Sequence, residues 1–456
     1  MESIREAAVP PTAADEAAPP PAVGPLGGAV GPLGDVGALV EEDRVHGSVY
    51  TDPHLFDLEM RAVFGRTWVY VAHESEIREA GDYKRATIGR SPVIVARGAD
   101  GAVRVLFNRC RHRASLVCRE NAGNAHFFRC PFHGWTYRNS GRLVGVPRAG
   151  RYGEGLDKDA LGLTPVPRVD SYRGLVFASL DPDIVPLPEY LGGIRPYLDR
   201  IFLHEAFEKA LDLSAGGNRQ TYPGNWKHAA EGGVDGYHAT TLHETWFKIR
   251  DQHPDRPHAR LASRDETVGY SEAHPNGHVL LARWPSDGDI EAFRADYPEY
   301  TARLAAEHGP ALLRDFLGQF NLLIYPNLHL TLQNLRVITP IGPAETRITM
   351  HPMLIGDAPP ELNDERLREF EEAFATGAFI SPDDAEAFVC VQQGVAADAE
   401  PWLLLNRGLH DERRLDGGAR RGAPSDETPQ RGLLREWRRL MTAAAGTHAH
   451  APEGAR

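Results

Sequence analysis

The sequence predicts an α+β protein in two parts: a small, mostly β domain, then a larger domain in which helices wrap one antiparallel sheet. The chain has 456 residues, more than a single hydrophobic core usually organises. Short β-type runs separated by glycine-containing turns dominate up to about residue 185. Beyond that point, alternating strand patterns give way to amphipathic helical ones, which favours helices packed on one sheet.

The two ends of the chain are expected to lack fixed structure. Residues 1–40 are rich in Ala, Pro and Gly and contain few large apolar side chains, so burial cannot offset the entropy cost of ordering this arm. The last residues, 446–456, read GTHAHAPEGAR and are expected to fray.

The first folded domain is predicted to span residues 41–185. Near its start, LFDLEMRAVF spaces its apolar residues as a short helix does. Apolar runs then indicate strands at WVYVAH (68–73), SPVIVARG (91–98), AVRVLFN (102–108) and GLVFASLD (174–181).

The second domain is predicted to span residues 186–445, after a proline-rich crossover. Its strands are expected within HVLLARW (278–284), FNLLIYPNLHLTLQNLRVI (320–338) and TRITMHPMLI (346–355). Leu328, Leu330 and Leu332 alternate with polar residues, as in a half-buried antiparallel sheet. Helical patterns follow in LREFEEAFATGAF (367–379) and RGLLREWRRLMTAA (431–444).

The composition narrows the possible partners and compartment. A formal net charge of -13 would repel a phosphate backbone, so no nucleic-acid partner is expected. The N-terminus has no basic flank before an apolar core, and no stretch approaches the ~18 apolar residues of a membrane span. We therefore expect a cytoplasmic protein without a membrane segment, whose four cysteines need not form disulfides.

Two of the cysteines belong to a pair of mixed sulfur and nitrogen hooks, Cys110-Arg-His112 and Cys130-Pro-Phe-His133. A structural zinc site more often uses four cysteines, or groups its cysteines apart from its histidines. With two bridged irons, each hook can give its cysteine to one iron and its histidine to the other. From the spacing alone, both zinc and a [2Fe-2S] cluster stay possible.

The residues around the hooks favour the cluster. CRH followed by CPFHGWTY resembles the Rieske iron-sulfur motif. The resemblance implies that Cys110, His112, Cys130 and His133 bind a Rieske [2Fe-2S] cluster, and that Trp135 packs beside it. Neutral imidazoles in place of two thiolates raise the cluster's reduction potential, which suits it to receive electrons from a carrier.

A second group of metal-binding residues lies in NWKHAAEGGVDGYHATTLHETW (225–246), which contains Asp235, His238 and His243. Two imidazoles and a carboxylate on one face of a metal leave positions open for dioxygen, as in non-haem Fe(II) oxygenases. On a regular helix His243 would point away from His238, so the helix must bend, bulge or end between them.

Together the two motifs resemble the large (α) subunit of aromatic-ring-hydroxylating Rieske oxygenases. The resemblance runs from about Asp43 to Met441 and includes SVYTDPHLFDLEM, YPNLHL and DETPQRGLLREWRRLM. It implies a catalytic domain of the helix-grip type, in which helices wrap an antiparallel sheet. One departure is visible, because many relatives have Glu-Asn where this chain has Glu231-Gly232.

The resemblance also implies the remaining site residues. A mononuclear Fe(II) would be bound by His238, His243 and a later carboxylate, for which SPDDAEAF offers Asp383, Asp384 and Glu386. Asp384 matches best. Asp235 is assigned a catalytic role as a bridge between His238 and the Rieske histidine of a neighbouring subunit.

These features predict the terminal oxygenase component of a dioxygenase. It would use O2 and electrons from NAD(P)H, delivered by a reductase with or without a ferredoxin, to dihydroxylate an aromatic ring. The segment DGYHATTLH favours the benzoate, anthranilate and salicylate type, so an aromatic acid is the expected substrate. Electron transfer between subunits implies a trimer of α chains, alone or with small β subunits (α3 or α3β3).

Three alternatives stay open at this point. The same metal sites could insert a single oxygen atom or demethylate an aromatic substrate, because metal ligands do not fix where the substrate lies. The chain could instead be a non-catalytic iron-sulfur electron carrier or a zinc-binding protein. Metal analysis separates these last two from an oxygenase.

Overall fold

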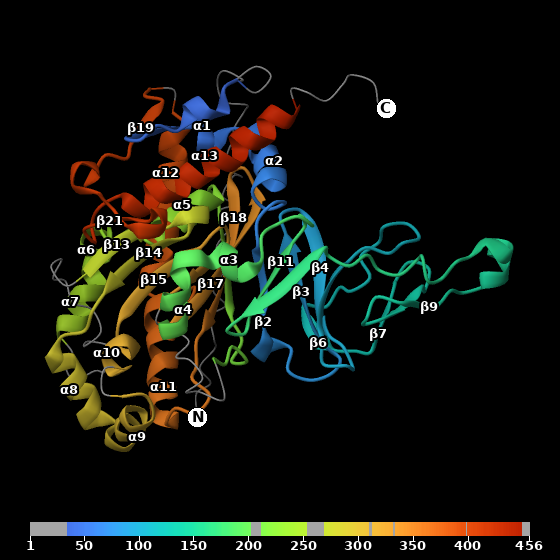
Figure 1. Cartoon of the computed structure of the whole chain (residues 1–456), viewed down its shortest axis with the longest axis horizontal. Coiled ribbons are helices and arrows are strands. Elements are labelled where there is room, and N and C mark those ends of the chain that lie inside the picture. Colours follow the sequence, from blue (N-terminus) through green and yellow to red (C-terminus); the bar gives the residue numbers. More distant parts are fainter. Residues whose placement is uncertain are drawn as a thin grey trace, which may run out of the picture.

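The fold is described from a computed structural model, for residues 34–201, 211–252, 269–309, 312–331, 333–397 and 399–448. Figure 1 shows a β-rich domain on the right and a larger mixed domain on the left. The α+β prediction is therefore confirmed. No helix in the described ranges is long and apolar enough to cross a membrane.

The β-rich domain consists of three small antiparallel sheets. A four-stranded sheet in the order β5-β4-β3-β6 is formed by Asp82–Ile88 (β3), Ser91–Arg97 (β4), Val103–Phe107 (β5) and Ala122–Asn124 (β6). A three-stranded sheet at the far tip is formed by Phe127–Arg129 (β7), Thr136–Arg138 (β8) and Leu143–Gly145 (β9). A third sheet, nearest the larger domain, is formed by Val69–His73 (β2), Arg168–Tyr172 (β10) and Leu175–Ser179 (β11).

The larger domain is built on one nine-stranded antiparallel sheet, in the order β12-β18-β17-β16-β15-β14-β13-β21-β20. Its strands are Asn218–Tyr222 (β12), Gly269–Ala273 (β13), Val279–Arg283 (β14), Gln319–Ile324 (β15), Leu328–Leu330 (β16), Asn334–Gly342 (β17), Glu345–Pro352 (β18), Arg413–Arg414 (β20) and Arg420–Gly422 (β21). The expected run 320–338 is thus three strands, separated by a turn at Tyr325-Pro326 and by the segment before Asn334, and Leu332 lies outside the described residues. All three β16 residues are buried, because both faces of the strand are covered.

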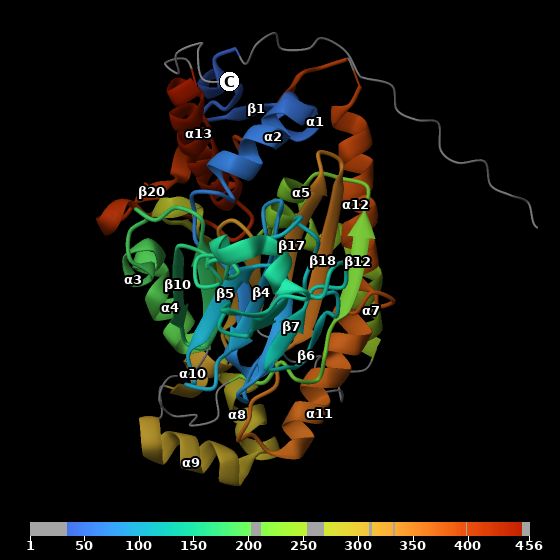
Figure 2. The same cartoon turned by 90° about the vertical axis from the view of Figure 1, so that its right-hand side faces the viewer.

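Helices wrap this sheet. Trp226–Gly232 (α5) and Ile380–Val395 (α12) pack over β12, β17 and β18, as Figure 2 shows. The C-terminal helix Thr428–His448 (α13) crosses β13 and β14. The remaining helices are Ser48–Thr51 (α1), Pro53–Ala62 (α2), Leu187–Leu191 (α3), Arg195–Ile201 (α4), Ala239–Leu242 (α6), Glu244–Gln252 (α7), Asp287–Asp296 (α8), Pro298–His308 (α9), Leu312–Phe316 (α10) and Pro360–Glu369 (α11), which continues as a π-helical turn to Phe374.

The N-terminal residues differ from the expected arrangement. Residues 34–40 were expected in a loose arm, but Val36–Leu39 form a one-turn 3-10 helix that packs on α13, because Val36 and Val40 are buried there. The helix α2 was expected in the first domain and also packs on α13. The strand β1 (Arg44–His46) pairs with Trp402–Leu404 (β19), far along the chain. Residues 1–33 and 449–456 lie outside the described residues.

One buried carboxylate connects three of these helices. Glu59 of α2 accepts hydrogen bonds from Lys227 Nζ at 2.5 Å, Trp226 Nε1 at 2.8 Å and Trp437 Nε1 at 2.6 Å. Glu59 and Lys227 are both fully buried, and burial lowers the pKa of Lys227 while Glu59 opposes that shift. The Lys227 ammonium also lies 5.1–5.9 Å from the ring centroids of Trp226, Tyr50 and Trp437. The Glu59 group therefore fixes α5 against α2 and α13.

We predict that Glu59→Leu lowers the free energy of unfolding by about 3–5 kcal/mol, because it leaves the Lys227 cation buried without a counter-charge. Denaturant unfolding followed by tryptophan fluorescence measures this. The control is Asp57→Asn on the same helix, whose half-exposed pair with Arg90 should contribute at most about 1 kcal/mol. Equal effects of the two substitutions would contradict the role of Glu59.

Candidate metal centres

The two sulfur and nitrogen hooks form two similar loops at the tip of the β-rich domain. The first follows β5, and the second connects β7 to β8. Each loop is closed by a backbone hydrogen bond of 3.0 Å to the cysteine carbonyl, donated by Ala114 in the first loop and Gly134 in the second. Both donors have positive φ, 59° and 72°. At Gly134 a Cβ would approach Pro147 to 3.2 Å, so glycine suits that position.

The two hooks lie close together, as the contact between their histidine rings shows. Cys110 and Cys130 are buried free thiols, and the rings of His112 and His133 are 4.5 Å apart. Trp135 stacks on His112 at 5.2 Å, beside the hooks as expected. Within the described chain, the buried Nδ1 of His112 has no hydrogen-bond partner. Two thiols and two imidazoles with an unused nitrogen fit the donor set of a Rieske cluster.

Sequence reasoning overlooked Tyr137 in this motif. Its hydroxyl accepts a hydrogen bond from the Arg111 backbone amide at 3.1 Å and lies 3.3 Å from the Cys110 sulfur. The hydroxyl hydrogen is therefore available to the sulfur, and hydrogen bonds to cluster sulfurs raise the reduction potential. Tyr137 ends the quoted CPFHGWTY, so a signal for it was present.

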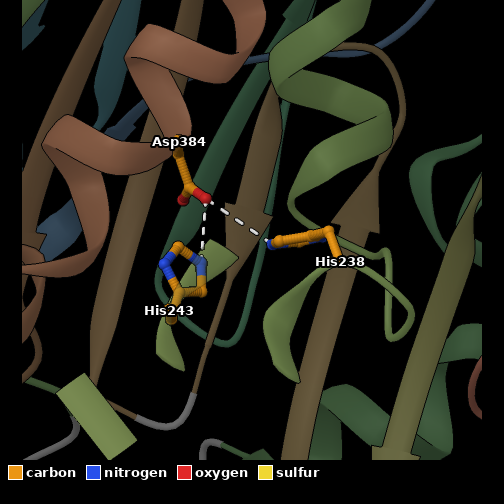
Figure 3. A group of neighbouring side chains, drawn as sticks. All are labelled: His238, His243 and Asp384. Carbon is orange, nitrogen blue, oxygen red and sulfur yellow. Dashed lines mark ion pairs between the residues drawn. The ribbon is translucent and has the colours of Figure 1, made fainter. Parts of the chain in front are cut away.

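The second group brings together His238, His243 and Asp384, as Figure 3 shows. His238 precedes the four-residue helix α6 and His243 ends it, so the break demanded by their spacing is present. Their rings are 5.2 Å apart. Asp384 comes from α12, and its Oδ1 lies 3.1 Å from His243 Nε2 and 3.6 Å from His238 Nε2. The three potential ligand atoms all lie within 4.8 Å of one another, which fits a single metal ion.

The electrostatics of this group favour a bound cation. Burial raises the pKa of Asp384, but the two histidines and Arg336 outweigh burial, so its pKa lies well below the usual range. Burial alone would lower the pKa of His238, yet the carboxylates of Asp235 and Asp384 raise it to about 9. Two nitrogens and an ionised carboxylate are the donor set that non-haem Fe(II) prefers.

The other candidate carboxylates lie farther from the group. Asp383 Oδ2 is 3.6 Å from His243 Nδ1, on the side away from Asp384, and its side chain is 43% exposed. Glu386 is exposed and contacts Cys390 at 3.7 Å. Neither residue belongs to the three-residue group among the described residues.

Asp235 lies on the opposite side of His238 from Asp384. Its Oδ2 is 3.5 Å from His238 Nδ1, and its Oδ1 accepts the backbone amides of Tyr237 at 2.6 Å and His238 at 3.3 Å. It therefore orients the imidazole from behind. A metal ligand often has such a carboxylate behind it.

Three further residues near this group were not identified from the sequence. Arg336 on β17 places Nη1 3.8 Å from Asp384 Oδ2, and His329 on β16 borders the same recess. Phe388 explains the departure at Gly232, because a Cβ at that glycine would lie 2.5 Å from the Phe388 ring. These contacts arise from strand pairing and helix packing, for which no local motif gives a signal.

Comparison with known proteins identifies both domains. Residues 67–172 match the family model "Rieske [2Fe-2S] domain", and residues 198–443 match "Ring hydroxylating alpha subunit (catalytic domain)". The chain is 34% identical to the 2-halobenzoate 1,2-dioxygenase large subunit of Burkholderia cepacia, over 84% of this chain and 85% of that protein. It is 36% identical to the toluate 1,2-dioxygenase subunit alpha of Pseudomonas putida, over 79% and 82%.

The fold comparison agrees. The crystal structure of naphthalene 1,2-dioxygenase from Rhodococcus sp. bound to indole superposes with a TM-score of 0.77, at 30% identity, over 88% of this chain and 94% of that chain. The predicted family and its cofactors, a Rieske [2Fe-2S] cluster and a mononuclear iron, are confirmed at the level of the family. The chain belongs to the Rieske non-haem iron aromatic ring-hydroxylating dioxygenases, as a large (α) subunit.

Proposed function

We propose that this chain dihydroxylates the ring of an aromatic acid, and that His238, His243 and Asp384 are the ligands of its mononuclear iron. The observation that carries the proposal is the convergence of these three donors, with Asp235 on the far side of His238. The 2-halobenzoate and toluate enzymes among its relatives act on aromatic acids, which supports that substrate class.

Each group of side chains has a separate proposed role. Cys110, His112, Cys130 and His133 would hold the cluster, and the bound iron and cluster supply O2 chemistry and single electrons, respectively. Asp384 presents Oδ1 to the two imidazoles while Arg336 lies at Oδ2, so Asp384 would help to hold the iron and Arg336 keeps its carboxylate ionised and in place. The His243 and Asp384 side chains are only 5% and 14% exposed, which keeps most bulk water away from that side of the group.

Electron transfer is proposed to run between subunits. In Figure 1 the strand β7, which leads into the second hook, lies in the right part of the molecule and α6 lies at the left, so one chain holds its two centres far apart. His133 and Phe132 are exposed at the tip, and the Asp235 side chain is 30% exposed. We propose that Asp235 links His238 to His133 of a neighbouring subunit in an α3 or α3β3 assembly.

The remaining partners follow from the same role. We propose that a reductase, directly or through a ferredoxin, delivers electrons from NAD(P)H, and that the protein works in the cytoplasm. We also propose domain limits of 41–185 and 186–445. Residues 34–66, at the start of the first domain, additionally pack on α13 of the larger domain.

The function is tested by product analysis under labelled dioxygen. Holoenzyme with a reductase is expected to convert at least one benzoate derivative to a cis-dihydrodiol acid in which both new oxygen atoms come from O2. Naphthalene and biphenyl serve as matched arenes without a carboxylate. Incorporation of one labelled atom would instead indicate monooxygenation, and turnover of only the hydrocarbons would contradict the substrate class.

The ligand assignment predicts different outcomes for two adjacent acids. Asp384→Ala should lose the mononuclear iron and all turnover while keeping the visible absorption of the Rieske cluster, because one of three donors is removed. Asp383→Ala is the matched control and should keep its iron, since Asp383 is outside the group. Iron content and spectra measure both. The reverse pattern would assign the ligand to Asp383.

The bridge assignment predicts that Asp235→Asn keeps its cluster and most of its mononuclear iron but fails to transfer electrons. The amide no longer carries the charge that orients and connects the imidazole. The measurement is single-turnover reoxidation of pre-reduced enzyme by O2 with substrate present. Reoxidation at the wild-type rate would exclude the bridge, whereas loss of iron comparable to His238→Ala would make Asp235 a ligand.

A further inference from the structure

A buried histidine that the metal assignment does not use lies beside the mononuclear group. His329 is the middle residue of β16 and is 2% exposed. It borders a recess that Asp384 also lines, so the recess adjoins the metal group directly. His329 itself is not one of the three residues whose donor atoms converge among the described residues.

The two ring nitrogens of His329 have different surroundings. A hydrogen bond from the ring to the backbone of Gly233 opposes the lowering of the pKa of His329, and because the buried Nε2 has no partner within the described chain, we assign this hydrogen bond to Nδ1. Burial and the Arg336 charge lower the pKa of His329 to about 3, so the ring is neutral at physiological pH. With its one proton on Nδ1, a neutral imidazole presents Nε2 as a hydrogen-bond acceptor.

The Gly233 contact also fixes the ring's position. A Cβ at Gly233 would lie 2.8 Å from Cε1 of His329, so the ring lies directly against the backbone of the segment that leads to Asp235 and His238. The imidazole is thus packed along its Cε1 edge against the metal-binding segment, and its Nε2 is buried without a hydrogen-bond partner among the described residues. Because a buried acceptor left without a hydrogen bond destabilises the structure, a hydrogen-bond donor is expected to occupy this place.

Arg336, another polar residue of the recess, is already engaged. Arg336 donates from Nε to Asn334 at 3.0 Å, lies 3.8 Å from Asp384, and stacks over Phe374 at 5.3 Å. The remaining walls are largely apolar and include Ile338, Ile348, Met350 and Phe388. A mainly apolar recess with a few polar groups, beside a cluster of metal-binding side chains, is the usual form of a small-molecule site.

We propose that His329 is a specificity-determining residue, whose Nε2 accepts a hydrogen bond from an amino or hydroxyl group on the ring of the aromatic acid. The inference rests on the proposed function and refines its substrate class. An aromatic acid that carries an ortho N–H or O–H donor would satisfy the acceptor. A ring with a methyl group or hydrogen at that position would leave Nε2 unpaired, and would bind less tightly.

The test compares four acids on the holoenzyme with its reductase: 2-aminobenzoate, 2-hydroxybenzoate, 2-methylbenzoate and benzoate. Both kcat/KM and anaerobic equilibrium binding are measured. The wild type is expected to prefer the two donor-bearing acids by about tenfold or more, the effect of one hydrogen bond to a buried acceptor. His329→Leu, of similar size, should remove most of that preference by improving 2-methylbenzoate relative to 2-aminobenzoate.

His329→Gln is the matched control, because its amide oxygen can accept a hydrogen bond from a similar position. It should keep the preference for the donor-bearing acids. Iron content and the Rieske spectrum show whether each variant is folded and loaded. If an iron-loaded His329→Leu enzyme keeps the wild-type preference for the donor-bearing acids, the inference about His329 is wrong, while the proposed function is unaffected. In that case Nε2 of the wild type would bind a water molecule instead. If the wild type oxidises none of the four acids, that result contradicts the proposed function as well.

Discussion

The buried ion pair between Glu59 and Lys227 is the contact on which the arrangement of the larger domain depends. Lys227 belongs to α5, and the segment after α5 carries Asp235, His238 and His243. Glu59 reaches it from α2 and at the same time binds the indole of Trp437 on α13. Because a buried charge without a partner is very costly, the three helices can come together in few other ways. The ion pair therefore fixes the position of α5, and with it the start of the metal-binding segment that follows.

The second constraint is that one carboxylate, Asp384, contacts both histidines and Arg336. Asp384 faces two imidazoles through Oδ1 and a buried guanidinium through Oδ2, so three positive or potentially positive groups surround it. An ionised carboxylate in this setting is strongly preferred, and it is one of the groups that a divalent cation needs. Its neighbour Asp383 is more exposed and faces the other nitrogen of His243. Asp384 therefore belongs to the metal group, whereas Asp383, the preceding residue of α12, lies at its edge.

Local patterns in the sequence predicted what depends on neighbours along the chain. The hooks at Cys110 and Cys130 and the break between His238 and His243 are set by spacing, so the sequence was enough to place them. The strand at Leu328 and the helix at Trp437 were also found by periodicity. The attachment of residues 34–66 to α13 was not predicted, because it depends on contacts with residues far along the chain, such as the hydrogen bond from Arg438 to the Val40 carbonyl. Arg336 and His329 were missed because only the pairing of β15, β16 and β17 turns them toward Asp384.

The two histidines of the metal group differ in how they are exposed and paired. His243 is almost fully buried, and its Nδ1 makes no hydrogen bond within the described chain. His238 is less buried and has a carboxylate at each end, with Asp384 at Nε2 and Asp235 at Nδ1. Asp235 in turn is partly open to solvent. His243 has a comparable pair, with Asp384 at Nε2 and the more exposed Asp383 at Nδ1. Asp235, however, also accepts the backbone amides of Tyr237 and His238, so the polar path from Asp384 through His238 is held in place by the backbone.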